Sequence, residues 1–331
     1  MAQRRGLQGK KKFTMEGDIP VLEPLSSKSV GFTVKNFIDK QNDFMVVKRV
    51  EGVADRTMED YVKFFKYIND WIKVEITDIE NRGIEKAVFL GYIGYMVQKY
   101  KPCTVNLRLR VIKCYLRWLY SEKFIQEDIA EKLKLVKVPK DTILPLSPSE
   151  VRKLFRKLDL SIYPEYRDFV AMVIMLETGI RVKELCNLFV KDIDIKDKLI
   201  TVRAEVAKTR EKRVLPVSGK TMKYIQRLLS IAEKNGELYL FNSAYGGKME
   251  TLSMIRGFTK YGKRAGITHR CTPHVIRHTF AVEAVRAGMD IFTLMKLMGH
   301  ANISTTRQYI QLNTDDLVKS HSKANILGRF L

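Results

Sequence analysis

The segment TPHVIRHTF, residues 272–280, has the pattern of a helix that begins at a capping threonine. Thr272 suits the N-cap and Pro273 suits the first helical position. His274 and Arg277 then share one face near the helix N-terminus, because they are three residues apart. That end of a helix favours anions, so this pair suits a phosphate. Taken alone, the segment is more typical of a capped helix with a core histidine.

The segment TGIRVKEL, residues 178–185, contains a second arginine beside a helix break. Gly179 is expected to end one helix, which leaves Arg181 near the N-terminus of the next. Glu184 lies one turn further on, where its carboxylate can orient the guanidinium. A surface ion pair explains the same spacing when the segment is considered alone.

The segment LMGHANISTTRQYI, residues 297–310, predicts a helix that ends at Gly299 and leaves His300 in the following turn. Ser304 can cap the next helix, which carries Tyr309. Because the chain has 14 tyrosines, a position in the core is the ordinary interpretation of any one of them.

Two segments with strand composition, LITVR at 199–203 and RVLPV at 213–217, predict a small hairpin or sheet on a helical body. Pro216 would confine its strand to an edge, because proline lacks the donor that a central strand needs. The turn between the strands carries Lys208. A lysine at a hairpin tip can reach into a groove, although by itself it is a surface lysine.

Charge indicates the partner. The 331 residues include 59 lysines and arginines against 37 acids, a net charge of +22. Such an excess destabilises the compact state by self-repulsion unless a polyanion is near, and nucleic acid is the obvious one. A basic protein of another kind, such as a ribosome-associated one, remained an alternative on charge alone.

Metal and membrane chemistry are disfavoured. The four cysteines stand far apart without a CxxC pair, which favours isolated core thiols in a reducing cytosol over a zinc site. The acidic segment KDIDIKDK, with Asp192, Asp194 and Asp197, is interpreted as a solvated turn rather than a metal site. The basic start MAQRRGLQGKKK has no apolar segment after it, and no apolar run reaches membrane-spanning length. A cytoplasmic location without cofactors is expected.

Four regions follow from these patterns: a basic tail at 1–27, a helical domain at 28–135, a linker at 136–146 and a second domain at 147–331. Ser147, Pro148 and Glu150 form a capping-box sequence that begins the second domain. The tail after Tyr309 ends in apolar residues, which predicts that it packs against protein, on its own domain in the simplest case, rather than staying in water.

The first domain and the linker carry basic residues that suit phosphates. A helix predicted at 104–120 buries Leu109, Ile112, Leu116 and Leu119 and presents its cations on another face. That face is either solvated or in contact with DNA. The candidate DNA-binding residues are Arg108, Arg110, Lys113, Arg117, Lys134, Lys137 and Lys140.

Each segment is common by itself, but their order is specific. The HxxRH and GH…Y segments, with the preceding arginine and lysine, closely resemble the catalytic domain of the tyrosine recombinases, the family of phage integrases and Xer-type recombinases. The resemblance covers residues 147 to about 315, and the first domain and linker resemble more loosely the family's core-binding domain. It implies a mainly α (α+β) fold: a helical domain and a mixed catalytic domain with a small β-hairpin or sheet, forming a clamp on DNA.

The resemblance also implies residue roles. Arg181 and Arg277 resemble the pair that clamps the scissile phosphate, and His274 and His300 the pair that completes the pocket and assists proton transfer. Tyr309 resembles the nucleophile.

Two supporting residues follow from the same resemblance. Lys208 resembles the hairpin lysine that protonates the leaving oxygen, and Glu184 the acid that supports the pocket. Relatives often flank this lysine with glycines, whereas Ala207 and Thr209 flank Lys208. Lys212 is near enough to be a rival.

Phosphodiester chemistry agrees with these roles. Two fixed guanidinium groups bind the phosphate oxygens and stabilise charge that builds in the transition state, so no metal is required. A phenol, with a pKa of about 10, needs a base or a positive field to attack at neutral pH. The basic leaving oxygen needs an acid.

The sequence therefore predicts a site-specific DNA recombinase that cuts and rejoins DNA through a covalent 3′-phosphotyrosine bond, without metal or ATP. It would act on double-stranded DNA with specific core sites, as a tetramer, in integration or transposition or in dimer resolution. A type IB topoisomerase-like enzyme and a non-catalytic DNA-binding protein of the same fold are the alternatives.

Overall fold

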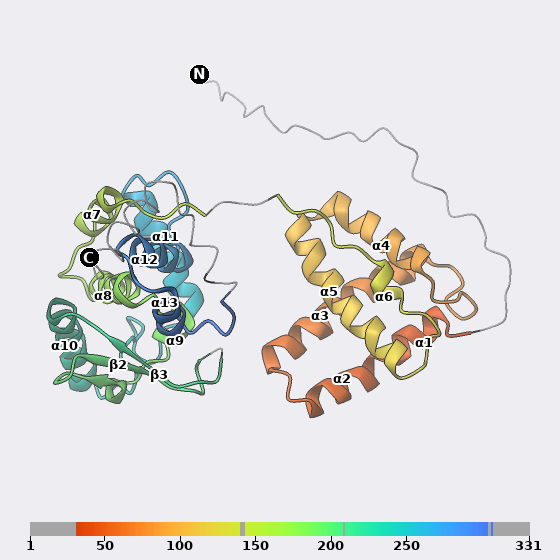
Figure 1. Cartoon of the computed structure of the whole chain (residues 1–331), viewed down its shortest axis with the longest axis horizontal. Helices are drawn as coiled ribbons and strands as arrows, with labels where there is room; N and C mark the ends of the chain where they lie inside the picture. Colours follow the sequence, from red (N-terminus) through yellow and green to blue (C-terminus); the bar gives the residue numbers. More distant parts are fainter. Residues whose placement is uncertain (1–30, 140–142, 208, 304–305, 307–331) are drawn as a thin grey trace, which may run out of the picture. The chain divides into compact units, whose positions relative to one another are not determined.

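The computed structural model describes residues 31–139, 143–207, 209–303 and 306. The chain divides into two compact units, residues 1–140 and 141–331 (Figure 1). The division falls within the segment expected to be a linker. Lys140, Lys208, Ser304 and Tyr309 lie outside the described residues, as do the N-terminal tail and the tail after the tyrosine.

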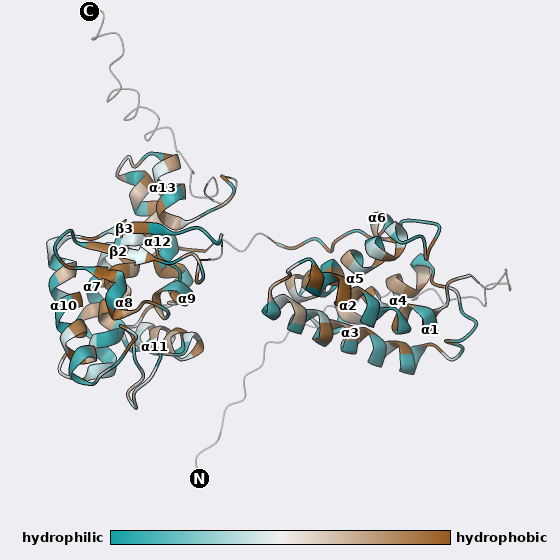
Figure 2. Cartoon of the chain, turned by 90° about the horizontal axis from the view of Figure 1, so that it is seen from below, coloured by the Kyte–Doolittle hydropathy of each residue, from teal (hydrophilic) through white to brown (hydrophobic). Residues whose placement is uncertain are grey.

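The described part of the first unit is helical, as predicted. Its elements are α1 (Val34–Asp39), α2 (Gln41–Val50), α3 (Asp55–Glu75), α4 (Lys86–Lys99), α5 (Pro102–Ser121) and α6 (Ile129–Lys132). The ribbon of α3 alternates between hydrophobic and hydrophilic colours in Figure 2, as expected for an amphipathic helix. Leu109, Ile112, Leu116 and Leu119 of α5 are buried in the core, as their spacing predicted.

Aromatic packing centres this core on Tyr115. Its ring lies 5.1 Å from that of Phe44 and 5.0 Å from that of Phe37. The hydroxyl donates a 2.8 Å hydrogen bond to the carbonyl of Phe37, so the buried polar atom has a partner. These contacts hold α5 against α1 and α2.

The second unit is a helical body with one small sheet. Its helices are α7 (Pro148–Arg156), α8 (Tyr163–Thr178), α9 (Val182–Leu185), α10 (Gly219–Lys234), α11 (Thr251–Arg264), α12 (Pro273–Arg286) and α13 (Ile291–Met298), with a short 3₁₀ helix at Val190–Asp192. The capping box predicted for α7 is confirmed, since Ser147 Oγ accepts from the Glu150 amide and Glu150 accepts from the Ser147 amide. Helix α12 packs against α8 inside this unit.

The sheet has three antiparallel strands, β1 (Ile193–Asp194), β2 (Leu199–Val202) and β3 (Arg213–Pro216), in the order β1-β2-β3. Pro216 lies opposite Leu199 on the edge strand β3, as predicted. The sequence did not predict β1, which falls in the acidic segment.

The expectation of a solvated acidic turn is wrong for Asp192. This residue is buried, and its carboxylate accepts from the Phe189 amide at 2.8 Å and from Arg203 Nε at 3.0 Å. Asp194 and Asp197 are exposed. The prediction that the cysteines are isolated core thiols is correct for Cys186 and Cys271, which are buried and free. It is wrong for Cys103, which is exposed.

Candidate active site

Helix α8 ends at Gly179, whose backbone is left-handed with φ +63°. A Cβ at this position would lie 2.4 Å from Cδ1 of Phe280, so both the conformation and the close approach require glycine. The sharp turn then places Arg181 at the N-cap of α9. The predicted helix break and the position of Arg181 are therefore confirmed.

Glu184 is the carboxylate that organises the arginines. It is 1% exposed. Its oxygens accept from Arg181 Nη1 at 3.0 Å and from Arg213 Nη1 and Nη2 at 3.2 and 2.5 Å. Burial alone would raise the pKa of Glu184, but the hydrogen bonds and charge of Arg213, followed by those of Arg181, hold the pKa below its ordinary value. Glu184 is thus a charged anchor for two guanidinium groups.

Arg277 connects the ends of two helices. It is 6% exposed, and its guanidinium donates to the carbonyl of Gly179, at the end of α8, and to that of Met298, at the end of α13. Arg181 Nη2 donates to the carbonyl of Gly299 at 2.7 Å. Both arginines are therefore held by carbonyls at the C-terminal end of α13, which brings their charges to one place.

His300 completes this cluster. Arg277 Nη2 donates a 2.7 Å hydrogen bond to His300 Nε2, and His300 Nδ1 lies 2.8 Å from the hydroxyl of Thr306. A guanidinium only donates, so Nε2 must be the unprotonated nitrogen. Burial, and after it the charge of Arg277, lowers the pKa of His300 to about 4. The imidazole is therefore neutral at pH 7.

His274 lies at the solvent-facing start of α12. Thr272 caps this helix by accepting from the Val275 amide, and Pro273 is its first residue, as predicted. Partial burial of the ring by neighbouring protein atoms, and after it the charge of Arg277, lowers the pKa of His274. His274 precedes Arg277 by three residues on α12, so the two side chains lie on the same face of this helix.

Four of the predicted site residues are thus joined by hydrogen bonds, directly or through the carbonyls at the end of α13: Arg181, Glu184, Arg277 and His300. Lys208 and Tyr309 lie outside the described residues, so their positions stay predictions. Lys212 is exposed beside the start of β3.

Arg213 and Thr306 are site residues that the sequence reasoning missed. Arg213 Nε donates to the carbonyl of Leu297 at 3.0 Å while its Nη atoms hold Glu184. A signal was available, because alternation along β3 places Arg213 on the same buried face as Leu215. A buried strand cation needs a carboxylate partner. No comparable signal exists for Thr306.

The basic residues of the first unit divide into two groups. Arg110 and Arg117 of α5 are exposed, and so are Lys134 and Lys137 after α6. Lys113 is partly buried and donates to the carbonyl of Leu133. The exposed four are free of such backbone contacts among the described residues.

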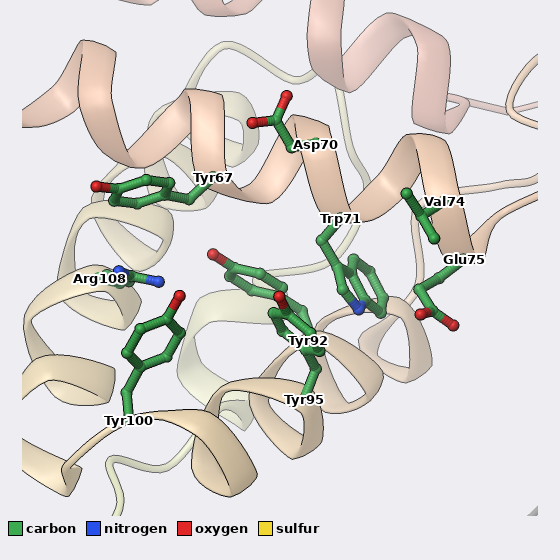
Figure 3. Close-up of a pocket in the computed structure, with 9 residues that line it drawn as sticks. All are labelled: Tyr67, Asp70, Trp71, Val74, Glu75, Tyr92, Tyr95, Tyr100 and Arg108. Carbon is green, nitrogen blue, oxygen red and sulfur yellow. The ribbon is translucent and has the colours of Figure 1, made fainter.

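The expectation that Arg108 lies on a phosphate-binding face is wrong. Its side chain is buried between two tyrosine rings, with the guanidinium carbon 4.1 Å from the ring centres of Tyr67 and Tyr100. Figure 3 shows Arg108 pointing towards Tyr100 and Tyr92 in a pocket lined by side chains of α3 and α4 and by Tyr100, which follows α4. Burial raises the pKa of Tyr92 to about 12 against the opposing charge of Arg108. Cation–π contact therefore accounts for this arginine.

Neither a metal centre nor a membrane helix is present in the part of the chain that the structure describes. No group of three or more histidine, cysteine, aspartate or glutamate side chains is arranged to hold a metal there. Among the described helices, none combines the length and the apolar character that crossing a membrane requires.

The helical fold with its small sheet carries a cluster of arginines, Arg181, Arg213 and Arg277, beside His300. Guanidinium groups gathered in this way suit a protein that binds a phosphate group. Residues 145–316 match the phage integrase family. The tyrosine recombinase XerA of Thermococcus onnurineus is 33% identical over 232 residues, which are 69% of this chain and 77% of that protein.

Two solved structures share the fold. The integrase of the transposon Tn1549, in complex with a circular intermediate DNA, superposes with a TM-score of 0.71 at 21% identity, over 88% of this chain and 99% of that one. A lambda integrase tetramer bound to a Holliday junction superposes with a TM-score of 0.66 at 18% identity, over 84% and 77%. The chain belongs to the phage integrase family. It is a tyrosine recombinase, an enzyme that transfers DNA strands.

Proposed function

We propose that this recombinase cuts and rejoins double-stranded DNA at specific core sites, through a 3′-phosphotyrosine bond made by Tyr309. The observation that carries the proposal is the shared anchoring of Arg181 and Arg277 at the C-terminal end of α13. The segment that leads to Tyr309 begins at the same place. A phosphate held by both guanidinium groups would therefore lie close to the start of that segment.

Each residue has a distinct role in the proposed reaction. Arg181 and Arg277 bind the non-bridging oxygens of the scissile phosphate and stabilise the charge that builds on them. Glu184 acts through the arginines, since it touches Arg181 and Arg213. His300 and His274 complete the pocket and exchange protons with the reacting groups in this proposal, and His300, with a pKa of about 4, does so from its neutral form.

The bonds balance without an external energy source. The phenolic oxygen of Tyr309 attacks phosphorus as its proton passes to a neighbouring base, and the bond from phosphorus to the 5′ oxygen breaks. Lys208 gives a proton to the leaving oxygen. Attack by a 5′ hydroxyl on the phosphotyrosine reverses these steps. The energy of the broken linkage is kept, so neither ATP nor a metal ion is needed.

The two units divide the work of DNA binding in this proposal. Residues 28–135 form the core-binding domain, which contacts DNA phosphates through Arg110, Arg117, Lys134, Lys137 and Lys140, with Lys113 beside them. Residues 147–331 form the catalytic domain and its C-terminal tail, and residues 136–146 link the two. The basic tail at 1–27 contacts DNA as an arm or stays in solvent.

Assembly of the protein on DNA is the remaining part of the proposal. The lambda integrase tetramer on a Holliday junction supports a tetramer that exchanges strands. The proposed strand exchange serves integration or transposition, or dimer resolution. The apolar tail after Tyr309 would dock on a neighbouring protomer in that assembly. The enzyme would act in the cytoplasm.

A suicide substrate tests the reaction. Candidate sites are found by footprinting, and a nick placed next to the scissile phosphate lets the short product diffuse away and traps the covalent adduct. We expect adduct formation at the same rate in EDTA as in magnesium. An adduct that appears only with magnesium would replace the arginine mechanism with a metal-assisted one.

A further inference from the structure

Thr306 is a buried residue whose hydroxyl points at the ring of His300. Its exposed fraction is 0%, and Oγ1 lies 2.8 Å from Nδ1 of His300. The Thr306 amide donates to the carbonyl of Ile303 at 2.9 Å, which fixes the backbone as well. A threonine at this place therefore holds the imidazole ring from the side opposite Arg277.

The hydrogen bonds set the tautomer of His300. Because Arg277 donates to Nε2, the neutral ring carries its proton on Nδ1 and donates it to Thr306 Oγ1. A hydroxyl also donates, so it can rotate and support Nδ1 when Nε2 carries the proton and faces a phosphate. Thr306 thus suits both neutral forms of the ring, whereas an apolar side chain suits neither.

The same contact restrains the segment that carries the nucleophile. Thr306 precedes Tyr309 by three residues. Three residues of fully extended chain span at most about 11 Å, so fixing Thr306 at His300 limits how far the Tyr309 backbone can move away.

We propose that Thr306 is a positioning residue that orients His300 in the phosphate pocket and tethers the segment leading to Tyr309 to it. The inference rests on the proposed role of Tyr309 for its second half. Its first half, the control of the imidazole, stands on the described residues alone.

Matched variants separate this role from simple packing. Thr306→Val keeps the shape and removes the hydroxyl, and Thr306→Ser keeps the hydroxyl. Thr221→Val is the control, because Thr221 is also buried, at 4% exposure, and touches Ser218 rather than the site. Thermal unfolding of each variant verifies that it is folded. Should Thr306→Val not fold, Thr306→Ala takes its place.

The first readout is the ¹⁵N NMR spectrum of the full chain labelled at histidine. The chain has five histidines, and His300→Gln assigns the His300 signals. We expect the wild type, Thr306→Ser and Thr221→Val to show a single Nδ1–H tautomer for His300. We expect Thr306→Val to keep this tautomer, because Arg277 still donates to Nε2, but to lose the hydrogen bond of Nδ1–H, seen as an upfield shift of its ¹H signal and faster exchange with water. An unchanged His300 spectrum in folded Thr306→Val overturns the proposal.

The second readout is the rate of covalent adduct formation on the suicide substrate. Loss of one hydrogen bond is expected to slow Thr306→Val about tenfold at nearly unchanged DNA affinity, with Thr306→Ser restoring most of the rate. Thr306→Val at the wild-type rate overturns the tether. A wrong assignment of the nucleophile would be detected separately. In that case Tyr309→Phe would still form adducts, while the NMR result for Thr306→Val would be unchanged.

Discussion

Arg277 and His300 share a 2.7 Å hydrogen bond in which the guanidinium donates to Nε2 of a neutral imidazole. Two consequences follow. The positive charge of the pocket belongs to the arginines and not to this histidine at neutral pH. A phosphate bound at Nη2 of Arg277 would have to compete with Nε2 of His300 for that hydrogen.

The lowered pKa of His300 predicts a pH dependence of stability. Its pKa is about 4 in the folded protein against an ordinary value of 6.5. Between these two pH values, His300 is therefore protonated in the unfolded chain and unprotonated in the folded protein. The contribution to stability is complete above pH 6.5 and is lost as the pH falls towards 4.

We expect His300→Gln to flatten the decline of the free energy of unfolding between these pH values, measured by urea denaturation. His274 and His278, whose pKa values are also lowered, preserve part of the slope. An equal slope in the variant and the wild type would show that His300 is not held neutral.

Glu184→Gln tests the anchor of the arginines. Removing the charge leaves Arg181 and Arg213 beside a neutral amide, and breaking a buried ion pair costs about 3 kcal/mol. Displacement of a clamping group is expected to slow cleavage about 100-fold. Glu283→Gln is the control, because Glu283 pairs with Arg286 on the surface and should change stability by less than about 1 kcal/mol. Similar effects of the two variants on unfolding and cleavage would refute the anchoring role.

Gly179→Ala tests the turn that positions Arg181. Gly236→Ala is its matched control, since Gly236 has φ +65° but nothing within 4 Å of an added Cβ. The control is expected to lose about 1 kcal/mol from the left-handed backbone alone. Gly179→Ala adds a clash with Phe280, so it should lose more stability and also slow cleavage. Equal losses of stability would mean that Phe280 moves aside freely.

The local features of the site were predictable from the sequence, whereas the long-range ones were not. The caps at Ser147 and Thr272 and the break at Gly179 depend on neighbouring residues, and the structure contains all three. Arg213, the second partner of Glu184, is 29 positions away on a strand, so the spacing of residues along a helix did not indicate it. Arg108 was misassigned because one of the two rings that enclose it, Tyr67, comes from a distant helix, α3.

The hairpin lysine is tested by the leaving group. Lys208→Ala should slow cleavage of ordinary DNA strongly, because the leaving oxygen then lacks an acid. A substrate with a 5′-bridging sulfur has a better leaving group and should restore the rate of this variant. Lys212→Ala should be affected less and gain little from sulfur. The opposite pattern of rescue would assign the acid to Lys212.

Covalent adduct formation by Tyr309→Phe is the most direct measurement of the central claim. The substitution keeps the ring and removes only the nucleophilic oxygen. Incubated with the suicide substrate, this variant should bind the site with nearly wild-type affinity and give no protein–DNA adduct in a denaturing gel, while the wild type gives one. An adduct formed by Tyr309→Phe would contradict the account, because another side chain would then attack the DNA.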